Sequence, residues 1–198
     1  IRFGRQYYFR GDFMDFFDLH CDTLTECMDD GDSLLKNKRD IDFERGKIFG
    51  RWNQVFAVFI PDSMDDSLVE SYFDSACDFY LSELKKKGDF FPILSAEDVR
   101  GHSRGVMLAM ESSRGVGSLE RLEKLYERGL RLITLTWNHK NRAAGGCDEG
   151  GGLTDWGREL VSKMEKLGIV TDVSHLSDRS FYDLCEFSDA PFIASHSD

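Results

Sequence analysis

The sequence lacks the features that mark nucleic-acid-binding and membrane-spanning proteins. Basic residues are in the minority, with 25 Lys and Arg against 36 Asp and Glu, so the formal net charge is −11. Binding to nucleic acid or to an anionic membrane surface requires clustered positive charge, and we therefore expect neither partner. No apolar run approaches the roughly 18 residues of a membrane span. The N-terminal stretch has no continuous apolar segment and does not resemble a signal peptide.

The cysteines form neither a C-x-x-C pair nor a disulfide framework. There are 5 of them, an odd number, and they are widely spaced. This pattern favours reduced thiols and a cytoplasmic protein. Cys21 lies between two candidate metal ligands, but in a strand its side chain would point to the opposite face. We therefore expect Cys21 to pack in the core.

Short apolar runs alternate with helical patterns along the chain. The runs are rich in aromatic and β-branched residues, and they predict strands at 16–20, 54–60, 105–111, 130–136, 169–175 and 190–196. Apolar faces at helical spacing predict helices at 65–87, 118–129, 154–168 and 178–188. Helices between buried strands predict an α/β fold with a parallel sheet. The glycine-rich stretch 143–153 has neither G-x-G-x-x-G order nor a P-loop lysine, and we interpret it as a flexible loop.

Side chains that can bind metal stand where the predicted strands end. In a parallel α/β sheet these ends lie at one face, where such folds build their sites. Imidazole and carboxylate groups suit zinc or a similar divalent metal. The candidate ligands are His20, Asp22, Glu111, His175 and His196.

These candidate ligands are more numerous than a single catalytic zinc needs, since such an ion usually takes about three protein ligands. The surplus predicts two ions, with Glu111 as the bridge because each carboxylate oxygen can bind one of them. His20 and Asp22 would hold one ion, because residues two apart on a strand point the same way. His175 and His196 would hold the other.

The sequence resembles the membrane dipeptidase (renal dipeptidase, peptidase M19) family of the amidohydrolase superfamily. The resemblance runs from about residue 15 to residue 198 and rests on DLHCDTL, AMESSRG, RLITLTWN, GLTDWGRELVSKMEKLGIVTDVSHLS and APFIASHS. It implies a (β/α)8 TIM-type barrel with two zinc ions held by the candidate ligands above. It also implies hydrolysis of dipeptides by a metal-bridging hydroxide and tolerance of a D-residue at the C-terminal position. Dimers are frequent in the family, so a homodimer is expected.

Two departures from the family pattern concern the substrate site and the length of the barrel. Many members have a His directly after the LTLT strand that binds the tetrahedral intermediate, whereas this sequence has Trp137-Asn138-His139. We take His139 as a candidate catalytic residue, and Asn138 and His139 as candidate substrate-binding residues. The family's Arg for the substrate carboxylate and its last-strand Asp have no counterpart here. With only about six β/α units visible, we expect residues 14–198 to be an incomplete barrel domain from a longer protein, and residues 1–13 to be a non-native or disordered extension.

Other functions stay open on the sequence. Another amidohydrolase, such as an N-acyl-amino-acid deacylase or a lactonase, would use the same ligands, and the predicted rim loops 23–53 and 137–153 carry no readable substrate code. A non-catalytic metal-binding or assembly module would pair its exposed edge strands with another chain. A PHP-type metallophosphatase would be expected to have H-x-H after the first strand, where this sequence has H-x-D.

Overall fold

The computed structural model describes residues 15–86 and 90–197. Residues 1–14, 87–89 and 198, and with them the predicted extension, lie outside this part of the chain. Within it, parallel strands form one sheet in the order β1-β2-β4-β5-β6-β7, and β3 pairs beside the start of β4. The strands are β1 (Asp15–Asp18), β2 (Arg51–Phe59), β3 (Phe91–Pro92), β4 (Arg104–Glu111), β5 (Leu130–Thr134), β6 (Val170–Asp172) and β7 (Phe192–Ile193).

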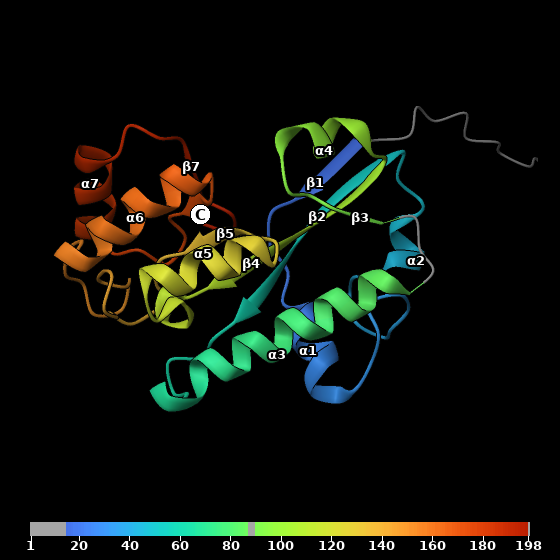
Figure 1. Ribbon diagram of the computed structural model, residues 1–198, viewed down its shortest axis with the longest axis horizontal. Helices are drawn as coiled ribbons and strands as arrows, with labels where there is room; N and C mark the ends of the chain where they lie inside the picture. The colour runs from blue at the N-terminus through green and yellow to red at the C-terminus, as the bar shows by residue number, and fades with distance from the viewer. Residues whose placement is uncertain (1–14, 87–89, 198) are drawn as a thin grey trace, which may run out of the picture.

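Helices follow most of the strands along the chain and cover the sheet. Figure 1 shows α3 lying along the sheet with α1 beside it, and α5, α6 and α7 toward the C-terminal end. Among the described residues, no helix is both long and apolar enough to cross a membrane. The helices are α1 (Thr23–Asp30), α2 (Phe43–Gly46), α3 (Asp66–Lys85), α4 (Ala96–Gly101), α5 (Leu119–Glu127), α6 (Asp155–Leu167) and α7 (Asp178–Phe187), with a 3-10 turn η1 (Ser113–Val116).

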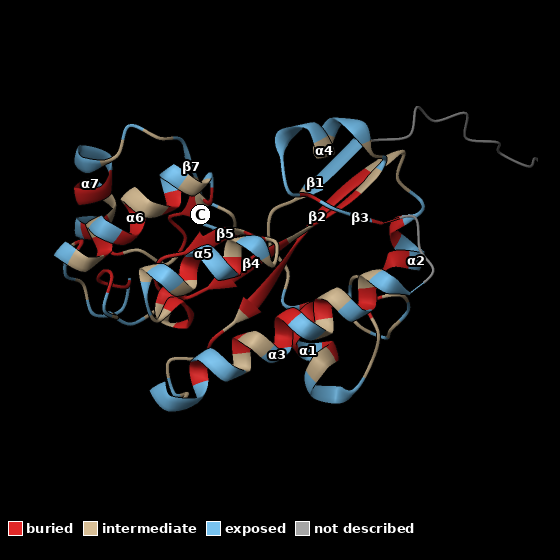
Figure 2. Cartoon of the chain, in the orientation of Figure 1, coloured by how far each residue is buried: buried red, intermediate tan, exposed pale blue. Residues whose placement is uncertain are grey.

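Alternating side chains of the strands divide the apolar residues into two clusters. Phe56 of β2 points to the face covered by helices and joins the main cluster, which also takes side chains from α3, α5 and α6. Its neighbours Val55 and Ala57 point to the opposite face and pack in a smaller cluster with residues of β4 and β5. In Figure 2 the central strands β2, β4 and β5 are therefore mostly buried and β1 is mostly exposed, while α3 shows one buried and one exposed face. Burying a side chain such as Phe56 contributes about 1.5–3 kcal/mol.

The α/β class and the partial TIM-type barrel are confirmed. The expected strands form the continuous path of the sheet, and the four expected helices correspond to α3, α5, α6 and α7. The interpretation of 23–53 as a rim loop is wrong in part, because this segment contains α1 and α2 as well as the start of β2. Short capped helices such as α4, which has a capping box of Ser95 and Asp98, carry too few apolar residues to show a helical period.

Candidate metal centre

Glu111 is the point at which the candidate ligands meet. It is the last residue of β4, and its side chain is only 3% exposed. The Nε2 atom of His20 lies 3.5 Å from its Oε2. On the other oxygen, Oε1, the Nε2 atoms of His175 and His196 lie at 3.1 and 3.6 Å. Each carboxylate oxygen of Glu111 therefore has histidine partners of its own.

Asp22 completes this group from the turn after β1. Its Oδ1 lies 3.3 Å from Nε2 of His20, and its side chain is half exposed. Strand β1 ends at Asp18, and Asp22 is the N-cap of α1 with helical backbone angles. The expected reason for the proximity, equal parity on a strand, is therefore wrong. The two side chains meet because the chain turns between them into the helix.

Cys21, between these two ligands, packs against the main cluster and is partly buried. The expectation that it lies within a strand is wrong, because β1 ends three residues earlier. Burial raises the pKa of the Cys21 thiol to about 12. The thiol is therefore protonated at neutral pH and is a poor metal ligand or nucleophile.

Two residues of this site have a left-handed backbone. Among the described non-glycine residues, only Ser112 (φ 83°) and His175 (φ 67°) have positive φ. Ser112 directly follows Glu111. The carbonyl of His175 accepts hydrogen bonds from the hydroxyl of Thr136 at 3.2 Å and from the N–H of Cys147 at 2.9 Å. Such conformations persist where the surrounding contacts over-determine them, and they cluster at functional sites.

Asn138 orients His175. Its Oδ1 lies 2.8 Å from Nδ1 of that ring. An amide oxygen only accepts hydrogen bonds, so Nδ1 carries the ring proton and Nε2 presents its lone pair toward Glu111. The Asn138 carbonyl in turn accepts from the N–H of Asp148 at 2.9 Å. Asn138 was predicted to bind substrate, and in the structure its side chain contacts a candidate ligand.

The glycine-rich stretch 143–153 is packed against the site. Residues 143–146 are buried. Besides the contact of Asp148 with Asn138, the N–H of Cys147 reaches the carbonyl of His175. The stretch is a loop, as expected. These backbone hydrogen bonds hold it against Asn138 and His175.

The pKa values of His20 and His196 are shifted in opposite directions. Burial alone would lower the pKa of His20, but the hydrogen bond to Asp22 and the charge of Glu111 outweigh it and raise that pKa. Burial and the neighbouring His20 and His175 lower the pKa of His196. The Nε2 atoms of His175 and His196 are 2.7 Å apart. Unprotonated nitrogens that converge in this way repel one another unless a cation lies beside them, so this donor set fits a divalent metal.

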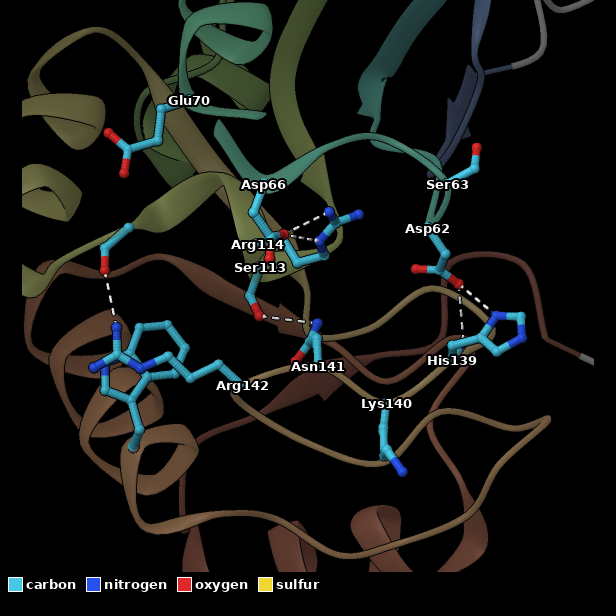
Figure 3. A pocket seen from close by; sticks show the side chains of 12 residues that line it. Asp62, Ser63, Asp66, Glu70, Ser113, Arg114, His139, Lys140, Asn141 and Arg142 are labelled. Carbon is cyan, nitrogen blue, oxygen red and sulfur yellow. Dashed lines mark hydrogen bonds and ion pairs between the residues drawn. The ribbon is translucent and has the colours of Figure 1, made fainter. Parts of the chain in front are cut away.

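His139 lies away from these imidazoles, at the rim. Its Nδ1 and backbone N–H approach Oδ2 of Asp62 at 2.8 and 3.0 Å, and its side chain is half exposed. Figure 3 shows His139 and Asp62 at one side of a pocket of about 770 Å³, with Arg114 and Arg142 elsewhere on the wall. Ser113, two residues after Glu111 in the chain, also lines the pocket, whereas none of the five candidate ligands is among its lining residues.

Three side chains near the ligands escaped the sequence analysis. Asp172 lies fully buried at the end of β6, and Ser174 and Ser195 directly precede His175 and His196. The available signal was an acid within the apolar run IVTDVSH, since an acidic residue is almost never fully buried unless it has partners.

A sequence model of the membrane dipeptidase family (peptidase family M19) matches residues 12–198. An uncharacterised dipeptidase of Schizosaccharomyces pombe is 40% identical over 86 residues, which cover 40% of this chain and 21% of that protein. An uncharacterised protein from the PQQ-III 3′ region of Acinetobacter calcoaceticus is 30% identical over 111 residues, covering 51% of this chain and 35% of the relative. The chain thus spans less than half the length of these curated relatives.

Solved structures share the fold. A metallopeptidase from Rhodobacter sphaeroides, liganded with a phosphinate mimic of the dipeptide L-Ala-D-Ala, superimposes with a TM-score of 0.80 at 22% identity, covering 94% of this chain and 66% of that chain. A family M19 metallopeptidase described as dipeptidase AC gives a TM-score of 0.83 at 24% identity, covering 94% and 64%.

Proposed function

Since this chain belongs to the membrane dipeptidase family, we propose that it provides the metal centre of a dipeptidase that uses two divalent cations, zinc by preference. The arrangement of Glu111 carries the proposal, because its two oxygens face different histidines from three other strand ends. A single buried carboxylate placed in this way can span two ions.

The proposed ligand sets follow the distances. His20 and Asp22 would hold one ion, His175 and His196 the other, and Glu111 both. When bound, the ions would lower the pKa of a water molecule and polarise the substrate carbonyl. The five ligand residues would hold the positive charge of the ions at the C-terminal end of the strands. The mechanism needs no protein nucleophile.

The substrate side of the proposal rests on the pocket lined by His139 and by Ser113, which follows Glu111 by two residues in the chain. Its volume of about 770 Å³ falls within the range of small-molecule sites. We propose that it admits a dipeptide, including one with a C-terminal D-residue, and the bound mimic in the Rhodobacter enzyme supports this class. His139 would contact substrate, and take any catalytic part, through Nε2, because Asp62 occupies Nδ1. Asn138 is engaged with His175 and would act from there.

The location and assembly of the protein are part of the same proposal. The cysteines of the described chain are free thiols, which fits a reducing compartment, and we propose a cytoplasmic protein. We also propose a homodimer, as is frequent in the family.

The test uses the complete gene product. We expect about two zinc ions per chain by elemental analysis, hydrolysis of L-Ala-L-Ala and L-Ala-D-Ala, loss of activity with a chelator and recovery with zinc. Cleavage of N-acyl-amino acids or lactones in place of dipeptides would assign the chain to another amidohydrolase activity. Bound metal without any hydrolysis would support the metal-binding or assembly module. Hydrolysis that survives removal of all metal would contradict the proposal.

A further inference from the structure

Asp172 lies fully buried behind the candidate metal centre and accepts four hydrogen bonds. Its Oδ1 accepts from the backbone N–H groups of Ser174 at 3.1 Å and Ser195 at 3.0 Å. Its Oδ2 accepts from the hydroxyls of Thr134 at 2.7 Å and Ser195 at 2.6 Å. Burial alone would raise the pKa of Asp172, but these hydrogen bonds outweigh it and lower that pKa. The side chain is therefore a buried anion with its oxygens satisfied.

The hydroxyl of Ser195 connects this anion to His196. Its oxygen lies 2.7 Å from Nδ1 of His196. A serine hydroxyl has one proton, and here it is donated to Asp172, so the oxygen must accept from the ring. Nδ1 of His196 then carries the ring proton, and the free lone pair is on Nε2, which faces Oε1 of Glu111 at 3.6 Å.

A purely structural role for Asp172 explains only part of this arrangement. The backbone N–H of Ser195 and the hydroxyl of Thr134 already join the ends of β5, β6 and the segment after β7 through this carboxylate. The second bond from Ser195, through its hydroxyl, adds no further link between strands. It does place an oxygen at Nδ1 of His196. Ser174 holds the backbone of the same residue, because its hydroxyl accepts from the backbone N–H of His196 at 3.1 Å.

We propose that Asp172, acting through the hydroxyl of Ser195, is a positioning residue that holds His196 in its Nδ1–H tautomer and so presents Nε2 as a metal ligand. The inference rests on the proposed function for its metal. Hydrogen-bond partners of metal-binding histidines orient the ring and raise its basicity, and their loss typically costs 10–100-fold in metal affinity.

Ser195→Ala is the decisive variant, because it removes the hydroxyl and keeps the backbone N–H that joins the strands. Ser195→Thr keeps a hydroxyl and should restore the wild-type behaviour. Ser197→Ala is the matched control: the Ser197 hydroxyl also stands next to His196, but it bonds to Ser174 at 3.2 Å. Asp172→Asn is a weaker test, since its loss of charge at a buried site can unfold the protein.

Two measurements on the complete protein test the proposal. In metal-free protein labelled with 15N-histidine, NMR should show the Nδ1–H tautomer of His196 in the wild type, Ser195→Thr and Ser197→Ala, and a mixture of tautomers in Ser195→Ala. The His196 signal is assigned by its absence in His196→Ala. Competition with a chromophoric chelator should show zinc binding weakened roughly 10–100-fold in Ser195→Ala alone.

An unchanged tautomer and unchanged zinc affinity in Ser195→Ala would overturn the positioning role, as would failure of Ser195→Thr to restore them. A wild-type protein that binds no zinc would overturn the proposed function. The two failures are distinguishable, because NMR reports on the ring without metal or turnover.

Discussion

Glu111 is buried, and three imidazole nitrogens lie within 3.6 Å of its carboxylate oxygens. Glu111→Gln keeps the shape but replaces one oxygen by an amide nitrogen that cannot bind a cation. We expect metal content to fall below one ion per chain. Metal ions supply several kcal/mol to catalysis, and each 1.36 kcal/mol is tenfold in rate, so kcat/KM for a dipeptide should fall roughly 100-fold or more. Glu127→Gln, on the exposed end of α5, is the control. Full metal content in Glu111→Gln would refute the bridging role.

Asn138 and His139 are neighbours in the chain with different partners, and this separates their roles. Asn138→Ala leaves Nδ1 of His175 without its acceptor, so zinc affinity should fall about 10–100-fold. His139→Ala breaks the contact with Asp62 at the pocket wall and should raise KM with zinc affinity unchanged. Zinc titration and steady-state kinetics on both variants check this. If Asn138→Ala raised KM and His139→Ala weakened zinc binding, Asn138 would be the substrate-binding residue and His139 the residue that supports the metal centre.

The pair of His139 and Asp62 also predicts a pH effect on stability. The hydrogen bond that His139 donates to Asp62 raises the pKa of His139 above 6.5, so the folded protein binds this proton more tightly than the unfolded chain. The stabilisation is complete below pH 6.5 and is lost as the pH rises through the raised pKa. Urea unfolding of the wild type and His139→Asn across this window should show midpoints that converge at high pH. The expected difference is small, because the pair lies at an exposed site. A constant difference between the two urea midpoints at every pH would show that the pair contributes nothing to the pH dependence of stability.

At the scale of the elements, the glycine-rich loop 143–153 packs against the residues that follow the strand ends and holds them in place. A Cβ atom on Gly146 would lie 2.4 Å from the backbone oxygen of Asn138. A backbone oxygen cannot avoid this clash by a change of side-chain rotamer. Gly146→Ala should therefore shift Asn138 and with it His175, and lower the unfolding free energy by about 1–3 kcal/mol. Zinc affinity should fall in the same variant. Gly101→Ala, whose Cβ would meet open space, is the control, and equal behaviour of the two variants would refute this role of the loop.

The elements show where sequence reasoning succeeds and where it stops. Long periodic segments such as α3 and buried runs such as β4 are predictable, because their apolar pattern follows from packing on the sheet. The residue at which strand pairing ends is not predictable from this pattern. The run at 169–175 pairs only as Val170–Asp172, and the left-handed turn at His175 depends on contacts with Thr136 and Cys147, which are distant in sequence.

The same limit applies to the candidate site. Its ligands could be named from sequence because the rule that places them, strand ends on one face, needs only the topology. The hydrogen-bond partners of those ligands need three-dimensional register. Asp172 lies inside a run that reads as strand, and only the pairing of β5 with β6 brings Thr134 to it. An acidic residue in that apolar run indicates that Asp172 has buried hydrogen-bond partners, but the sequence does not show which residues they are.

At the scale of the whole molecule, the candidate ligands come from both ends of the sheet. Strands β1 and β7 are the first and last in the sheet order, yet the rings of His20 and His196 lie with centroids 4.0 Å apart. The sheet therefore curves far enough to bring its two outermost strand ends together at Glu111. Metal bound there would link segments that lie at opposite ends of the sheet order.

Metal should consequently stabilise the whole fold and not only the site. A ligand at 100 times its Kd adds about 2.7 kcal/mol to the unfolding free energy, which for a chain of this size corresponds to roughly 5–11 °C in Tm. Calorimetry with zinc and with excess chelator should show this difference in the wild type. His196→Ala, which removes the ligand from the β7 side, should show a much smaller one. Equal Tm values with and without zinc in the wild type would mean that packing alone holds the curvature and that no ion bridges the two ends of the sheet.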